Sequence, residues 1–104
     1  MVTEIIKRNG VFVPFDAKKI RNAIFKANIR IADERIRDAD LDRLTEQVVT
    51  AISQNTKAPT VEQVQDLVEE KLIANGFAKT AKAYILYRAE HTKVRKTEAD
   101  LVNI

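Results

Sequence analysis

The sequence predicts an α+β domain in which an N-terminal β-hairpin packs on a bundle of about four α-helices. An Asn-Gly pair near the N-terminus lies between two β-prone runs, and four later segments repeat apolar residues at spacings of three and four. The 104 residues contain only two glycines and two prolines, too few turn residues for an all-β fold of many strands. This length is typical of a single domain.

The hairpin is predicted from Thr3–Arg8 and Val11–Phe15, which flank Asn9 and Gly10. Asn-Gly favours a two-residue type I′ turn, because both central residues of that turn need positive φ. Pro14 has no amide hydrogen for a strand ladder, so it indicates an edge or a strand end. Since an isolated hairpin is only marginally stable in water, we expect it to pack on the helices.

The first two helices are predicted from their caps and apolar stripes. Asp16 is a suitable N-cap for a helix from Ala17 to about Ile29. A second helix is expected from Leu41 to about Gln54, with Asp38 or Asp40 as its cap.

The third helix is predicted to begin at Thr60, because Gln63 three residues later completes a capping-box pattern. Gly76 is its expected C-terminal stop. A fourth helix is expected from about Ala78 to Lys96. Its segment 83–87 is apolar on all sides, which indicates burial or a face that lines a ligand pocket.

We expect residues 1–96 to form one domain. The amphipathic residues 97–104 form a tail that is expected to lead into a domain outside this chain.

Composition excludes several functional classes. There is no cysteine for a disulfide or a zinc-thiolate site, and His91 is the one histidine. No run is long enough for a membrane span and no signal peptide is present, so we expect a cytoplasmic protein without membrane partners. We found no Gly-rich phosphate loop or catalytic constellation, and we do not expect the domain to be an enzyme by itself. The net charge of +3 suits an anionic small molecule.

Two pairs of cations are candidates for anion binding. Lys7 and Arg8 end the first predicted strand, and Lys18 and Lys19 lie in the first turn of helix one. Lysines at that position oppose the helix macrodipole, whereas a bound phosphate would be favoured there. The alternative is that these side chains are simply exposed.

A second group of candidates lies later in the chain. Thr60 is either only a helix cap or a cap that also faces a ligand, assisted by Lys57. Tyr87 and Arg88, together with Tyr84, either supply an aromatic surface and a cation to a ligand or pack in the core with a snorkelling arginine.

The stretch from Ile5 to Ile20 combines Lys-Arg-Asn-Gly with Phe-Asp-Ala-Lys-Lys-Ile at fixed spacing, and it resembles the opening of the ATP-cone family. The start of helix three at Thr60 and the segment from Ala83 to Arg88 are similar to later parts of that family. The likeness is greatest to the cones of anaerobic ribonucleotide reductases. Many members carry Glu where this chain has Val13 or its neighbour Phe12.

The resemblance implies a regulatory domain that senses ATP and dATP, with Mg²⁺, and controls the catalytic domain of a ribonucleotide reductase. It also implies possible homo-oligomers through cone–cone contacts. It implies that Lys7, Arg8 and Lys19 bind the phosphates, with Lys18 as a second helix-one lysine, and that Ile5 lies against the base. The remaining residues implied at the nucleotide are Thr60, Asp16, Tyr87 and Arg88.

Two other functional classes stay open from the residues alone. A nucleic-acid-binding module would use the cations of helix four: Arg88, Lys93, Arg95 and Lys96. It would show a steep salt dependence and little response to free nucleotide, and we do not expect nucleic acid as a partner. A helical protein-interaction module would not respond to nucleotide at all.

Overall fold

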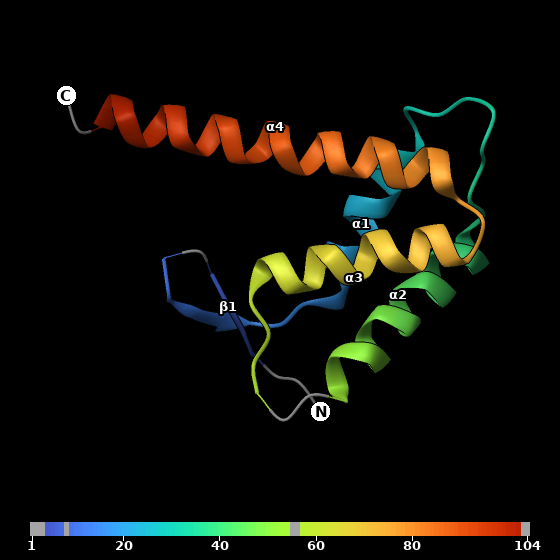
Figure 1. The fold of residues 1–104 in the computed structure, drawn as a ribbon, viewed down its shortest axis with the longest axis horizontal. Helices are drawn as coiled ribbons and strands as arrows, with labels where there is room; N and C mark the ends of the chain where they lie inside the picture. The colour runs from blue at the N-terminus through green and yellow to red at the C-terminus, as the bar shows by residue number, and fades with distance from the viewer. Residues whose placement is uncertain (1–3, 8, 55–56, 103–104) are drawn as a thin grey trace.

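The predicted α+β architecture is confirmed by the computed structural model, which describes residues 4–7, 9–54 and 57–102. A two-stranded antiparallel hairpin precedes four helices (Figure 1). The elements are β1 (Glu4–Ile6), β2 (Phe12–Pro14), α1 (Ala17–Asn28), α2 (Asp38–Ser53), α3 (Val61–Ala74) and α4 (Ala78–Val102).

The hairpin forms as predicted, but its turn is of a different type. The amide of Lys7 donates to the carbonyl of Val11 (2.8 Å), and the amide of Gly10 donates to the carbonyl of Lys7 (2.9 Å). Gly10 has φ +83°, whereas Asn9 does not have positive φ. The predicted type I′ turn is therefore wrong, because it needs positive φ at both central residues. Three residues separate Lys7 from Val11, and the last of them, Gly10, supplies the left-handed conformation that glycine adopts without strain. Two ends of the predicted strands, Thr3 and Arg8, lie outside the described residues.

Local capping fixes where α1 and α3 begin, as predicted. The Asp16 carboxylate accepts from the amide of Lys18 (3.0 Å). Thr60 and Gln63 form the full capping box, each side chain accepting from the other's amide. The expected cap of α2 was wrong. That helix begins at Asp38 after Arg37, and Arg37 makes no side-chain capping bond. The two aspartates lie inside the first turn of α2, where their charge complements the helix dipole.

The core lies where the helices meet, since α1 and α3 each pack against both α2 and α4. Its fully buried members come from the apolar stripes at helical spacing, and Ile24, Leu44, Val48, Ile52 and Leu72 are all 0% exposed. Ile5 and Phe15, from the two sides of the hairpin, pack against this core. The hairpin therefore covers one end of the bundle rather than standing alone.

From Ala78 to Glu90, where burial is described, the fourth helix is buried on one face only. Tyr84 is buried, whereas Ile85 and Leu86 are exposed. The apolar segment 83–87 therefore does not mark a helix buried on all sides. The helix continues without a break to Val102, and Figure 1 shows its C-terminal half extending beyond α3. A domain boundary after residue 96 stays a prediction.

A buried polar network ties the α1–α2 connection to the start of α4. The Asn28 amide group donates to the carbonyl of Glu34 (2.5 Å) and to Oγ1 of Thr80 (2.9 Å). Its oxygen accepts from the amide of Ile36 (3.0 Å). Both Asn28 and Thr80 are buried, so these bonds fix the connection against the bundle.

Candidate functional site

The hairpin joins the beginning of α3 through a direct backbone contact. The amide of Ile6 donates to the carbonyl of Pro59 (2.9 Å), and Ile6 and Thr60 form a parallel bridge. Figure 1 shows the hairpin beside this end of α3. Two groups of predicted site residues that are more than 50 positions apart in sequence therefore lie next to each other.

The described lysines of the predicted phosphate site are exposed to solvent. Lys7, at the end of β1, and Lys18 and Lys19, in the first turn of α1, are all exposed, and among the described residues none of the three forms an ion pair. The first turn of α1 contains no acidic residue. The Asp16 carboxylate that precedes it accepts from the Lys18 amide. These lysines are therefore available to an external anion.

The register of the hairpin sets the distance between Lys7 and the beginning of α1. Glu4 lies opposite Pro14, and only Phe15 and Asp16 separate β2 from α1, so α1 begins near the open end of the hairpin. Lys7 lies three residues further along, which is roughly 10 Å on a strand. Because side chains alternate along a strand, Lys7 continues the face of Ile5, which packs on the bundle. Arg8 lies outside the described residues.

Tyr87 belongs to α4 and lies near the C-terminal end of α1, opposite the end that carries Lys18 and Lys19. Its ring stacks on Tyr84, with ring centroids 6.5 Å apart and an interplanar angle of 26°. The guanidinium of Arg30 lies 5.7 Å from the centre of the Tyr87 ring and pairs with Glu90 (3.1 Å). Burial, the leading cause, raises the pKa of the Tyr84 hydroxyl well above its ordinary value.

Arg88 contacts two carboxylates of α3. Its Nη1 lies 2.5 Å from Oε1 of Glu69 and 3.1 Å from Oδ1 of Asp66. The side chains of Arg88 and Glu69 are only 19% and 20% exposed. The structure thus brings Ile5, Lys7 and Thr60 together and directs Arg88 toward α3.

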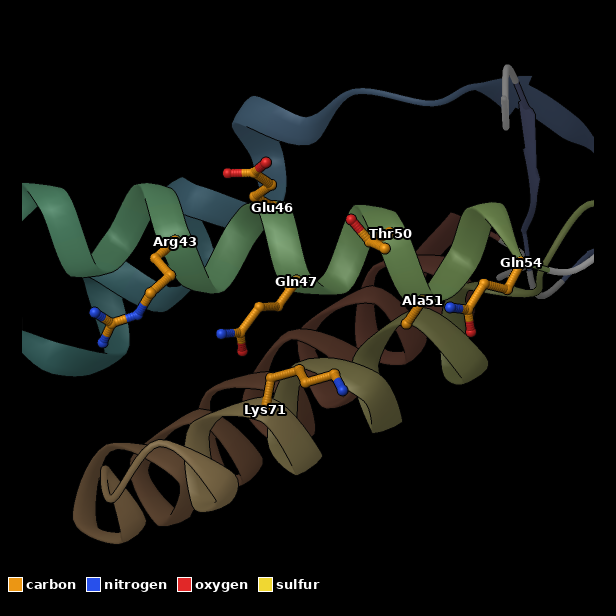
Figure 2. Close-up of a pocket in the computed structure, with 7 residues that line it drawn as sticks. All are labelled: Arg43, Glu46, Gln47, Thr50, Ala51, Gln54 and Lys71. Atoms are coloured by element: carbon orange, nitrogen blue, oxygen red, sulfur yellow. The ribbon is translucent and has the colours of Figure 1, made fainter.

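Two surface pockets lie elsewhere on the bundle. One of about 370 Å³ lies between α2 and α3, and Figure 2 shows Gln47 and Lys71 reaching into it from the two helices. The other, of about 480 Å³, is bounded by the segment after α1 and by α4, including Arg30, Ile31 and Leu86. None of the described residues that are predicted to bind nucleotide lines either pocket.

The described residues offer no protein cage for a metal, since no group of three or more His, Cys, Asp or Glu side chains lies close enough together to hold one. A hard cation such as Mg²⁺ keeps several waters and takes phosphate oxygens readily. A metal arriving with a nucleotide would fit this surface without needing protein ligands. Within the described ranges, no helix is both long and apolar enough to cross a membrane.

Sequence reasoning missed the residues that assemble the site. The contact from Ile6 to Pro59 is made by backbone atoms, so no side-chain pattern encodes it. The sequence indicates only weakly that Asn28 and Arg30 make contacts with distant residues. A polar residue at a position in register with the buried stripe of α1, such as Asn28, indicates a buried hydrogen-bond partner elsewhere.

Comparison with known proteins identifies the family of this domain. The chain belongs to the ATP cone domain family, whose model matches residues 3–93.

The similar proteins are ribonucleotide reductases of several types. The chain is 35% identical to the vitamin B12-dependent ribonucleoside-diphosphate reductase of Thermoplasma acidophilum, covering 100% of this chain and 14% of that protein. It is 39% identical to a ribonucleoside-diphosphate reductase subunit alpha of Chlamydia trachomatis over 88% of this chain and 10% of that subunit. It is 30% identical to the anaerobic ribonucleoside-triphosphate reductase of Escherichia coli over 97% of this chain and 14% of that enzyme. The chain thus spans about a seventh or less of these relatives.

Proposed function

We propose that this domain binds ATP or dATP where the hairpin meets the start of α3, and that it regulates the catalytic domain of a ribonucleotide reductase. The observation that carries the proposal is the contact of Ile6 with Pro59 and Thr60, which places the strand end and the α3 cap side by side. Membership of the ATP cone domain family and the reductase relatives support the ligand and the partner. The type of reductase stays open, because the relatives include several.

In this proposal the phosphates are bound by Lys7, Arg8, Lys18 and Lys19. The three described lysines are exposed and form no ion pair with other described residues, so phosphate would not have to displace a carboxylate. A charge-assisted hydrogen bond contributes about 1.5–3 kcal/mol. Mg²⁺ would be held mainly by phosphate oxygens and water, and it would neutralise part of the phosphate charge.

The same proposal assigns the nucleoside to Ile5 and Thr60. Ile5 supplies an apolar surface next to the strand end, and it is partly buried against the core. The hydroxyl of Thr60 accepts from the Gln63 amide (3.1 Å), so its hydrogen is available to donate. Phosphate contacts are common to ATP and dATP, so discrimination must come from the ribose 2′-hydroxyl. A ligand shifts a conformational equilibrium only through different affinities for the two states.

Thermal unfolding with Mg²⁺ and ATP, dATP or GTP tests this function, with Lys7→Ala as the site variant and Lys82→Ala as a matched surface control. A ligand at about 100 times its dissociation constant adds about 2.7 kcal/mol to the unfolding free energy. We expect adenine nucleotides to raise Tm in the parent chain and in Lys82→Ala, but not in Lys7→Ala. The absence of any shift at millimolar nucleotide would contradict the proposal and favour a protein-interaction module. Steeply salt-dependent binding to DNA would favour a nucleic-acid-binding module.

A further inference from the structure

We infer that Arg88 is a positioning residue for the proposed nucleotide site: it fixes the middle of α3 against α4 through Glu69 and Asp66, and so positions the helix that begins beside the hairpin, and it does not bind phosphate itself. The inference rests on the function proposed above. It replaces the role that the family resemblance implies for this side chain.

Arg88 already contacts two carboxylates of α3. One guanidinium nitrogen, Nη1, contacts both Glu69 (2.5 Å) and Asp66 (3.1 Å). Asp66 and Glu69 are three residues apart, so they lie on one face of α3. Arg88 and Glu69 are both largely buried, and breaking such a pair leaves a carboxylate without its partner. A phosphate would have to compete with this arrangement.

The local charge also disfavours phosphate at Arg88. In its ion pairs with described residues, one guanidinium faces two carboxylates, so the carboxylates outnumber the cation. A triphosphate that approached Arg88 would meet the carboxylates of Asp66 and Glu69. Lys7, Lys18 and Lys19 have no such neighbours in ion-pair contact within the described part of the chain.

The position of the pair explains what it does for the site. The far end of α3 is joined to α4 by a short turn, in which the amide of Phe77 donates to the carbonyl of Leu72 (2.8 Å). Asp66 lies six residues from Thr60, which is roughly 9 Å along the helix axis. Arg88 therefore adds an attachment to α4 at the middle of α3, with Asp66 in the half that follows Thr60 and Glu69 in the half that leads to Ala74. Pro59 and Thr60 contact Ile6, so this attachment also orients the strand that leads to Lys7.

Glu69→Gln distinguishes positioning from direct phosphate binding by the sign of its effect. If Arg88 bound phosphate, removing a competing carboxylate would raise the affinity for Mg–ATP or leave it unchanged. If Arg88 positions α3, the affinity falls. We expect a loss of about tenfold, equivalent to about 1.4 kcal/mol. Affinity is measured by calorimetry at a temperature at which circular dichroism shows each variant folded.

Glu70→Gln is the matched control. It makes the same charge change on the same helix, but Glu70 is exposed and forms no ion pair with the described residues. If the loss of one negative charge raises the affinity for Mg–ATP by itself, that increase therefore appears in both variants. We expect Glu70→Gln to retain the parent affinity, and Arg88→Lys to bind more tightly than Arg88→Gln, because lysine keeps the charge that pairs with Glu69.

Hydrogen exchange without nucleotide gives a second readout. We expect faster exchange of the Gln63 and Ile6 amides in Glu69→Gln than in Glu70→Gln, because these amides report the α3 cap and the strand contact. Unchanged exchange, or an ATP affinity in Glu69→Gln that equals or exceeds that of Glu70→Gln, would overturn the positioning role while leaving the nucleotide site standing. No ATP binding by the parent chain would overturn the proposed function and this inference together.

Discussion

The amide of Ile6 donates to the carbonyl of Pro59 across 2.9 Å, and this bond joins the N-terminal hairpin to the segment directly before α3. It brings the strand that leads to Lys7 next to the capping hydroxyl of Thr60. The α3 cap and the proposed nucleotide site are therefore in direct contact.

Thr60→Ala should destabilise the domain by about 1 kcal/mol, because the Gln63 amide loses its side-chain acceptor. In a domain of this size the change lowers Tm by about 4–8 °C. Thr60→Ser, which keeps the hydroxyl, should recover most of the loss in the same thermal scan. Equal Tm values for the alanine and serine variants would show that the capping box contributes little.

Asn28→Ala should destabilise the domain by about 1–3 kcal/mol in urea unfolding, because the Ile36 amide and the Glu34 carbonyl each lose a buried partner. Asn22→Ala, on the exposed face of the same helix, is the control and should change stability by less than about 0.5 kcal/mol. Similar effects of the two substitutions would mean that the network does not hold the α1–α2 connection.

Gly10→Ala should cost about 1 kcal/mol in urea unfolding, because φ at this position is +83° and a side chain with Cβ rarely adopts it. A Cβ there would meet no atom within 4 Å, so the cost comes from the backbone alone. Gly10→Asn should be tolerated better, since asparagine visits this conformation more readily. A larger loss for asparagine than for alanine would contradict the turn described here.

Asp33 should titrate below its ordinary range, because a hydrogen bond from Lys79 and its positive charge lower the pKa of the carboxyl group. A lowered pKa in the folded state contributes stability above the unfolded pKa, and that contribution disappears as the pH falls through the folded value. Lys79→Gln should raise the Asp33 pKa toward its usual value in an NMR titration, while Lys82→Gln should leave it unchanged. Both groups are exposed, so we expect only a small effect on stability.

Much of the fold could be predicted because its signals are local. The caps at Asp16 and Thr60 and the stop at Gly76 depend on residues within a few positions of each other, and each was found where expected. The turn type was wrong because Asn-Gly fits more than one hairpin loop, and register decides between them. The α2 cap was wrong because acidic residues suit both the cap and the first turn.

The site was harder to predict because its arrangement depends on contacts between distant residues. Lys7, Lys18 and Lys19 could be nominated from their positions, but the sequence does not show that Pro59 accepts from Ile6. Likewise, the bond from Asn28 to Thr80 joins residues 52 positions apart. Arg88 shows most clearly why side-chain contacts could not be predicted from the sequence, since the carboxylates of Asp66 and Glu69 lie on a different helix.

The most direct test of the proposed nucleotide site is an NMR titration of the isotopically labelled chain with Mg–ATP, in which each backbone amide reports its own environment. The account predicts that the largest shift changes occur at residues 5–7, at Lys18 and Lys19, and at Thr60, with little change along the α2–α3 pocket of Figure 2. Changes centred on that pocket or on the pocket beside Arg30, with none at the hairpin, would contradict it.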